Sequence, residues 1–222
     1  MTLYIIRHGE TALNRQNIVQ GSGVDSDLNA TGRRQAQMFF NYYQNVNFDL
    51  IITSALKRTH QTVAPFLTHL SVKNAPLIDF GTADSEKIKQ RKWLQSADLN
   101  EICWGINEGK EIGTEAESFH LKLMEDWSAG AYDSRVEKGE SAAELRERVQ
   151  KFVDFIKKTG KGKNILVCTH GRTLLCLLTI LTEGPLSKMN EFKHQNTCLY
   201  QAHLVGDEFI FELENDVRHL AN

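Results

Sequence analysis

Two histidines lie in matching surroundings near opposite ends of the sequence. His8 stands in the string Arg-His-Gly after the apolar residues 3–6, and His170 stands in Thr-His-Gly after the apolar residues 165–168. An imidazole can act as a nucleophile or transfer protons, and an adjacent guanidinium such as that of Arg7 can bind an anion. One such histidine is commonly structural, but two in the same context favour a shared site.

The apolar runs identify the elements that must position these side chains. Each run has the length of a strand that is buried on both faces of a sheet. Gly9 then permits a sharp turn or a close approach of the backbone. We therefore expect His8 and His170 at the carboxyl ends of two strands, where open α/β sheets bind their ligands.

The overall composition limits the classes of protein to consider. The chain has 222 residues, of which 41% are hydrophobic and 24% are charged, as expected for one α/β domain with an insertion. The net charge of −2 provides no basic field for nucleic acid or a membrane surface. The sequence has no N-terminal targeting pattern and no apolar run of the ~18 residues that cross a bilayer. Its four cysteines are scattered, which favours a reducing, cytoplasmic location.

Short apolar runs alternate with amphipathic stretches, which predicts βαβ units. We expect a three-layer α/β/α sandwich with a mostly parallel central sheet, an antiparallel edge and helices on both faces. The expected strands are residues 3–6, 48–53, 76–80 and 164–168, followed by a hairpin of 197–204 and 208–213. The expected helices are residues of about 32–45, 55–70, 116–127, 142–160 and 171–183.

Capping residues predict where several helices begin. Thr31 is expected to cap the first long helix and Ser54 the second, in which Pro65 should cause a kink or a late restart. Ser141 and Glu144 have the spacing of a capping box.

Two further residues could carry chemistry in the same crevice. Arg58 follows the second expected strand at a strand-to-helix junction, and its planar guanidinium matches phosphate oxygens. Glu101 lies between apolar residues, and partial desolvation would suit it to act as a general acid. Taken alone, Arg58 would more often be an exposed surface arginine, and the alternative for Glu101 is an exposed glutamate on a loop.

Together these segments resemble the signature of the histidine phosphatase superfamily, which has the phosphoglycerate mutase-like fold. The resemblance runs through nearly the whole chain, with the motifs in the order typical of the family. The segments that carry it are Arg7–Thr11 with Asn14, Gln20 with Gly21, Asp27–Gly32, Ser54–Thr62, Leu99–Gly109, Gly139–Ser141 and Thr169–Gly171.

The resemblance implies a mechanism of phosphoryl transfer. His8 would attack phosphorus and become a phosphohistidine, while Arg7, Arg58 and His170 would surround the phosphoryl oxygens. Glu101 would protonate the leaving alkoxide and then help to activate water. No metal ion and no cofactor is expected, because the arginines and the histidine take the place of a cation.

Further contacts follow from the same resemblance. Asn14 and the N–H of Gly171 are expected to bind phosphate, and Gln20 and Gly21 to contact the leaving group. The implied partner is a small-molecule phosphoester. The final hairpin could also pair across a two-fold axis and form a homodimer. The remaining histidines are expected to be structural: His60, His69, His120, His194, His203 and His219.

Several activities remain open. Phosphoglycerate mutases carry a longer insert than the stretch from Gly109 to Gly139, so a phosphomonoesterase is expected and a cofactor-dependent phosphoglycerate mutase is the alternative. A metal-dependent hydrolase with His8, His170 and Glu101 as ligands, and a catalytically silent phosphate-binding protein, are further alternatives. Residues of about 81–140 are expected to form an insertion that caps the site and selects the substrate.

Overall fold

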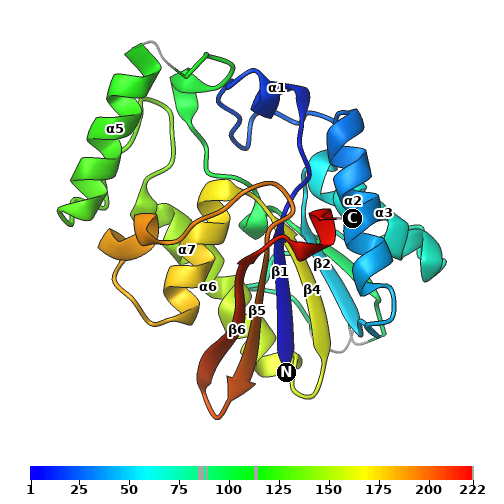
Figure 1. Ribbon diagram of the computed structural model, residues 1–222. Helices are drawn as coiled ribbons and strands as arrows, with labels where there is room; N and C mark the ends of the chain where they lie inside the picture. Colours follow the sequence, from blue (N-terminus) through cyan, green and yellow to red (C-terminus); the bar gives the residue numbers. More distant parts are fainter. Residues whose placement is uncertain (85–87, 89, 113–114, 222) are drawn as a thin grey trace.

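The computed structural model describes residues 1–84, 88, 90–112 and 115–221, and Figure 1 shows their arrangement. The strands are β1 (Thr2–Arg7), β2 (Leu50–Ser54), β3 (Trp93–Ser96), β4 (Asn164–Thr169), β5 (Leu199–Val205) and β6 (Glu208–Asp216). The helices are α1 (Ala12–Arg15), α2 (Ala30–Tyr43), α3 (Lys57–His69), α5 (Glu115–Ser128), α6 (Ala142–Thr159) and α7 (Gly171–Leu181). Short 3-10 helices are η1 (Ala97–Leu99), η2 (Gly105–Asn107), η3 (Leu186–Glu191) and η4 (Arg218–Leu220).

The strands form one mixed sheet in the order β3-β2-β4-β1-β5-β6. The pairs β1–β4, β4–β2 and β2–β3 are parallel, whereas β5 is antiparallel to β1 and β6 is antiparallel to β5. In the register of β1 with β4, Arg7 is paired with Thr169. The residues that follow, His8 and His170, therefore lie beside each other at one end of the sheet. The predicted parallel sheet with an antiparallel edge is confirmed.

Alternate residues of the strands enter two separate hydrophobic cores. Leu3 and Ile5 of β1 lie in the core beside α6 and α7, while Ile6 lies in the core beside α2 and α3. This alternation arises because successive side chains of a strand point to opposite faces. Figure 1 shows these two helix pairs on opposite sides of the sheet. The predicted three-layer α/β/α sandwich is therefore confirmed.

The helices of one face follow their sequence patterns closely. Ser141 and Glu144 form the predicted capping box at the start of α6, and Gly160 ends that helix. α7 is buried on nearly all sides, which fixes the segment that follows His170. Within the described ranges, no helix is long and apolar enough to cross a membrane.

Two predicted helix caps are wrong. Asn29, not Thr31, caps α2, because the Asn29 side chain accepts a backbone N–H of the first turn at 2.8 Å. Ser54 does not cap α3; Leu56 occupies the N-cap position, and Ser54 Oγ accepts the N–H of Leu56 at 3.1 Å. α3 continues through Pro65 as one helix, so of the two alternatives predicted there, a kink or a late restart, the restart does not occur.

The predicted third strand is also wrong. In residues 76–80 the structure has an isolated bridge between Leu77 and Gln95, and the third strand of the sheet is β3. Pro76 has no N–H and cannot extend a ladder; its carbonyl instead accepts the N–H of Gln95 at 3.1 Å. The polar stretch 81–98, for which no role could be predicted, thus contains this strand at the edge of the sheet.

Candidate active site

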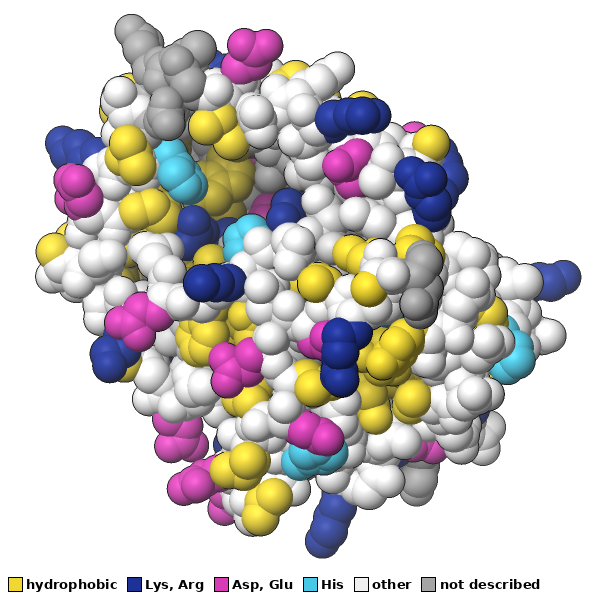
Figure 2. All heavy atoms as spheres, in the orientation of Figure 1, with side chains coloured by type: hydrophobic (Ala, Val, Ile, Leu, Met, Phe, Trp, Pro, Cys, Tyr) yellow, Lys and Arg dark blue, Asp and Glu magenta, His cyan; other side chains and the backbone are white. Residues whose placement is uncertain are grey.

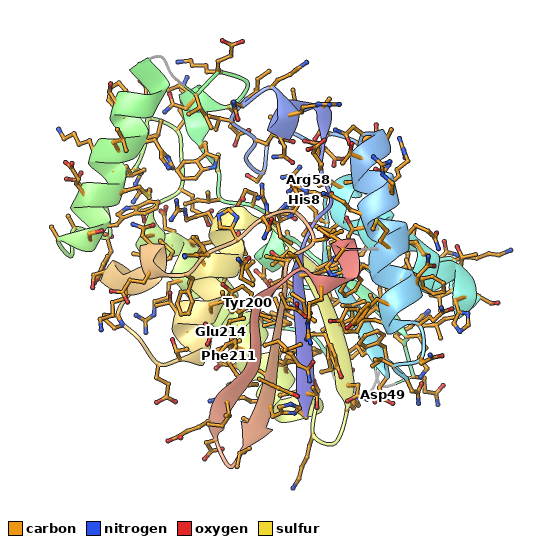
Figure 3. All side chains as sticks on the ribbon, in the orientation of Figure 1. His8, Asp49, Arg58, Tyr200, Phe211 and Glu214 are labelled. Atoms are coloured by element: carbon orange, nitrogen blue, oxygen red, sulfur yellow. The ribbon has the colours of Figure 1, made fainter. Side chains whose placement is uncertain are left out.

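The carboxyl ends of β1 and β4 bring the two motif histidines together. The ring centroids of His8 and His170 are 5.2 Å apart, and both side chains are buried. The N–H of His8 donates to the Thr169 carbonyl at 2.9 Å, which continues the ladder of β1 and β4 to the histidine itself. Figure 3 shows His8 and Arg58 side by side at this end of the sheet, with Asp49 at the opposite end.

The protein holds one nitrogen of His8 and leaves the other available. His8 Nδ1 lies 2.8 Å from the Gly9 carbonyl oxygen, and a carbonyl only accepts, so Nδ1 carries the proton and Nε2 keeps its lone pair. Within the described part of the chain, no group forms a hydrogen bond with Nε2. Burial, followed by the charges of Arg58 and Arg7, holds the pKa of His8 well below its usual value. His8 is therefore neutral near pH 7, the form in which Nε2 is nucleophilic.

The backbone around His8 is fixed from several directions. A Cβ atom on Gly9 would lie 2.7 Å from the Gly32 carbonyl oxygen, so α2 packs directly on this glycine. The Gly9 N–H donates to Thr62 Oγ1 at 2.9 Å, and Asn196 Nδ2 donates to the His8 carbonyl at 2.9 Å. The nucleophile is therefore positioned before a substrate arrives.

His170 differs from His8 because both of its nitrogens are engaged. Arg58 Nε donates to His170 Nδ1 at 3.0 Å, so the proton of the neutral ring is on Nε2, which donates to Ser54 Oγ at 2.8 Å. Ser54 can then donate to Thr59 Oγ1 at 3.0 Å, and Thr59 donates to the Leu56 carbonyl at 2.8 Å. Burial, followed by the charge of Arg58, holds the pKa of His170 well below its usual value. His170 therefore orients Arg58 in this arrangement.

Arg58 is a fully buried cation held by the loop that follows α1. Its Nη1 donates to the Val24 carbonyl at 2.6 Å and its Nη2 to the Gly21 carbonyl at 3.3 Å. Burial lowers the pKa of Arg58 to about 10, so the side chain is still charged near pH 7. A guanidinium has more N–H donors than these bonds and the bond to His170 use, so Arg58 can also bind an anion.

Arg7 carries a buried donor with no partner. Among the residues that the structure describes, no group accepts a hydrogen bond from Arg7 Nε, although this atom is buried. Arg7 Nη1 donates to His194 Nδ1 at 3.1 Å. An unpaired buried N–H costs free energy unless a ligand accepts from it. Arg7 and Arg58 are therefore arranged to receive anionic oxygens beside His8.

Glu101 is held at the start of α7. Its Oε1 accepts the N–H of Ile102 at 3.0 Å and the N–H of Thr173 at 3.1 Å, and its Oε2 accepts the N–H of Arg172 at 3.1 Å. Glu101 is 7% exposed, so it is largely removed from water, as its apolar neighbours predicted. A Cβ on Gly171 would lie 3.5 Å from Glu101 Oε2, which puts the carboxylate beside the residue after His170.

The other predicted site residues, Asn14, Gln20 and Gly21, differ in which of their groups are already bonded within the protein. Asn14 Oδ1 accepts the N–H of Thr11 at 3.2 Å, so its amide nitrogen is the end available to a ligand. The Gln20 side chain instead turns back to Thr11 Oγ1 at 2.9 Å. Gly21 offers its carbonyl to Arg58, and a Cβ at this position would collide with the carboxylate of Glu108.

A profile of the histidine phosphatase superfamily, branch 1, matches residues 3–80 and 81–217. The chain belongs to this superfamily.

Its relatives include both phosphatases and mutases by name. The chain is 28% identical over 228 residues to a Yersinia enterocolitica protein assigned as phosphoglycerate mutase GpmB, covering 99% of this chain and 95% of the relative. It is 25% identical over 217 residues to a Hydrogenobacter thermophilus protein assigned as phosphoserine phosphatase 2, covering 98% and 96%. The crystal structure of the α-ribazole phosphatase of Shigella flexneri matches with a TM-score of 0.79 at 23% identity, covering 97% and 96%. The prediction that the protein is an enzyme of the histidine phosphatase class is confirmed.

Two polar residues that precede β5 also border this site. The structural role expected of His194 stays a prediction; its Nδ1 accepts from Arg7, and burial, followed by the charges of Arg7 and Arg172, lowers the pKa of His194 to about 3. Asn196, which holds the His8 carbonyl, was not predicted at all. A signal was present, because β5 is antiparallel to β1 and so begins where β1 ends. The polar residues just before β5 must therefore lie beside His8.

The geometry also bears on the alternative of a metal-dependent hydrolase. Both nitrogens of His170 and both oxygens of Glu101 already accept or donate hydrogen bonds within the protein, and two guanidinium groups lie in the same pocket. In the described ranges, no group of three or more His, Cys, Asp or Glu side chains is placed to hold a metal ion. The donors converge instead as they would around an anion.

Proposed function

We propose that the protein is a metal-independent phosphomonoesterase that acts on a small phosphorylated metabolite through a phosphohistidine on His8. One observation carries this proposal: His8 has a held Nδ1–H and an available Nε2, beside a buried guanidinium nitrogen of Arg7 that lacks a partner among the described residues. That pairing of a nucleophile with unsatisfied cationic donors suits an incoming phosphate group.

In the first step, the Nε2 lone pair of His8 attacks phosphorus in line with the leaving oxygen. The N–P bond forms as the P–O bond breaks, and the electron pair of that bond passes to the leaving alkoxide. Arg7 and Arg58 donate to the non-bridging oxygens and stabilise their charge in the transition state. Glu101, acting as an acid, gives its proton to the alkoxide, and the alcohol leaves.

In the second step, water attacks the phosphohistidine. Glu101, now a carboxylate, takes a proton from the water as the O–P bond forms. The N–P bond breaks and its electron pair returns to His8 Nε2. Inorganic phosphate leaves, and the neutral histidine is ready for another cycle.

His170 acts in this scheme chiefly through its neighbour. It holds the Nε–H of Arg58 and would reach the phosphoryl group itself only after releasing Arg58 or Ser54. Asn14, through its amide nitrogen, and the N–H of Gly171 are further proposed phosphate donors.

We assign substrate selection to the segment of about 81–140 as a cap over the site. Support comes from α5, which stands above the sheet at the end where β1 finishes (Figure 1), and from two tryptophans of this segment, Trp104 and Trp127, which lie near the first turn of α7. Gln20 and Gly21 border the same side, as proposed contacts of the leaving group.

Phosphoglycerate mutase activity is a second candidate function, supported by the sequence identity to proteins assigned as phosphoglycerate mutase. A mutase uses the same phosphohistidine and returns the phosphoryl group to a second hydroxyl. Conversion of 3-phosphoglycerate to 2-phosphoglycerate, with no release of inorganic phosphate, would identify this activity. Release of phosphate would identify the hydrolase.

Hydrolysis of p-nitrophenyl phosphate with excess EDTA tests the main proposal. We expect turnover by the wild-type protein and by His69→Ala, which removes an exposed histidine, but none by His8→Ala. Turnover that EDTA abolishes would point to the metal-dependent alternative. Binding of phosphate without any turnover, including mutase turnover, would indicate a silent phosphate-binding protein.

A further inference from the structure

Arg172 lies next to the site, but the steps above do not use its side chain. Its backbone N–H donates to Glu101 Oε2, whereas its side chain extends to the cap segment. The guanidinium carbon lies 6.0 Å from the ring centroid of Trp104 and 5.8 Å from that of Trp127. These distances are in the range of cation–π contacts. The two indoles are stacked on each other, with 6.4 Å between their ring centroids, so the guanidinium lies beside this pair of rings.

The Arg172 guanidinium forms no ion pair among the residues that the structure describes, although the charge of Glu101 acts on it. Its one hydrogen bond from the guanidinium is from Nη1 to Asn190 Oδ1 at 2.6 Å, and in the described part of the chain no Asp or Glu forms an ion pair with it. The side chain is partly exposed. A guanidinium has five N–H donors in one plane, so most of them remain for a ligand.

The surroundings of Arg172 suit an organic anion. His120 packs on Trp104, with 5.2 Å between ring centroids, and burial followed by the charge of Arg172 lowers the pKa of His120 to about 4. His194, between Arg7 and Gly171, is also neutral near pH 7. Neutral rings do not repel the guanidinium or a cationic neighbour, and they can cover the carbon skeleton of a ligand.

Glu101 links Arg172 to the phosphoryl pocket. The charges of Arg7 and Arg58 act on both His8 and Glu101, while the Arg172 backbone is bonded to the Glu101 carboxylate, which would protonate the leaving group. Figure 2 shows a hollow on this face, between α5 and the loops that follow β1, in which basic, histidine and hydrophobic side chains meet. A leaving group that departs past Glu101 would therefore come next to Arg172.

We propose that Arg172, beside the stacked indoles of Trp104 and Trp127, binds a second anionic group, a carboxylate or a phosphate, on the leaving-group side of the substrate. This inference rests on the proposed phosphomonoesterase. It predicts that the preferred substrates are phosphorylated metabolites with a second negative charge, and that Arg172 is a specificity-determining residue and not part of the phosphoryl-transfer machinery.

Matched pairs of substrates test the subsite. 3-Phosphoglycerate differs from glycerol 3-phosphate by a carboxylate in place of a hydroxymethyl group, and fructose 1,6-bisphosphate differs from fructose 6-phosphate by a phosphate. We expect kcat/KM of the wild-type protein to favour the anionic member of at least one pair, and the pair that responds tells carboxylate from phosphate. Arg172→Gln should reduce that preference roughly 10- to 100-fold, as for the loss of a charge-assisted hydrogen bond.

Two further variants test whether a changed preference comes from the Arg172 guanidinium or from a general effect of substitution. Arg172→Lys keeps the charge but not the planar fork, so it should retain part of the preference. Arg33→Gln, which removes an exposed arginine of α2, should leave the preference unchanged. If Arg172→Gln does not fold, Arg172→Lys provides the test. We then expect its preference for the anionic substrate to be at least about threefold below that of the wild type.

The outcomes distinguish the two proposals. Absence of a preference in the wild-type protein, or a preference that the Arg172 variants leave unchanged, overturns the subsite. If no phosphoester is hydrolysed, the phosphomonoesterase proposal fails, but the subsite is still decided by binding. The dissociation constants of the same four compounds in His8→Ala, followed by tryptophan fluorescence, should show the same dependence on Arg172.

Discussion

The two His-Gly strand ends have similar local sequences but different chemical freedom. At the end of β1, His8 is tied through Nδ1 to its own Gly9 carbonyl, and Nε2 is left for reaction. At the end of β4, His170 has Arg58 on one nitrogen and Ser54 on the other. One histidine is therefore suited to attack phosphorus, and the other to hold the cation that stabilises the charge.

The difference comes from the neighbouring strands and not from the motif. β4 lies between β1 and β2, and β2 ends in Ser54, whose hydroxyl reaches the His170 ring. β1 lies between β4 and β5, and the residue that approaches from β5, Asn196, bonds the backbone carbonyl of His8 and not its ring. The order of strands in the sheet thus decides which imidazole is available.

The largest effect is expected from removal of the available imidazole. His8→Ala should lower kcat for p-nitrophenyl phosphate by a factor of about 10⁴ or more, because it removes the nitrogen that accepts the phosphoryl group. It should also abolish labelling of the protein by a radioactive phosphoester after an alkaline quench. A labelled His8→Ala protein would contradict the assignment of the nucleophile.

Removal of the engaged imidazole should have a smaller and different effect. His170→Ala removes the acceptor of Arg58 Nε, so kcat should fall roughly 10²- to 10³-fold, as for the loss of one transition-state contact. The phosphohistidine should still form, only more slowly. Loss of all labelling in His170→Ala, with the fold intact by circular dichroism, would reverse the roles of the two histidines.

Removal of the Ser54 hydroxyl, which accepts a hydrogen bond from His170, should have a smaller effect on catalysis. Ser54→Ala leaves the Nε2–H of His170 without its acceptor, which should lower kcat/KM about fivefold for a net loss of about 1 kcal/mol. The matched control is Ser128→Ala, which removes an exposed hydroxyl at the end of α5 and should change nothing. Equal rates for Ser54→Ala and the wild type would show that Ser54 does not position His170.

The smallest effect concerns the lowered pKa values that His8 and His170 share. Both pKa values in the folded protein lie well below the usual value, so between the folded and unfolded pKa values the unfolded chain binds more protons than the folded protein. Stability should therefore fall as pH drops below about 6.5, by up to about 1.4 kcal/mol per pH unit for each such histidine. Urea unfolding at about pH 7 and about pH 5 measures this, and His170→Gln should show a smaller decrease. An equal decrease in His170→Gln would count against a neutral, buried His170.

The sequence by itself determined the parts that depend on local pattern. The apolar runs before His8 and His170 fixed two strands, and the capping box of Ser141 and Glu144 fixed the start of α6. The alternation of strands and helices then required a parallel sheet, and a parallel sheet places the residues that follow its strands at one edge. His8, Arg58 and His170 could therefore be selected as one group from sequence pattern alone.

Only the tertiary structure decided what each group can do. Arg58 and His170 are 112 residues apart in the sequence, and Thr173 and Glu101 are 72 apart, so no local pattern reveals which nitrogen or oxygen is occupied. The tertiary structure also decided which segment forms the edge strand. Residues 93–96 and 76–80 have similar short apolar patterns, but residues 93–96 are the ones that pair with β2. The contact of Arg172 with two indoles is of the same kind: hydrogen bonds and ring contacts depend on distances in space, which the spacing of residues along the chain does not set.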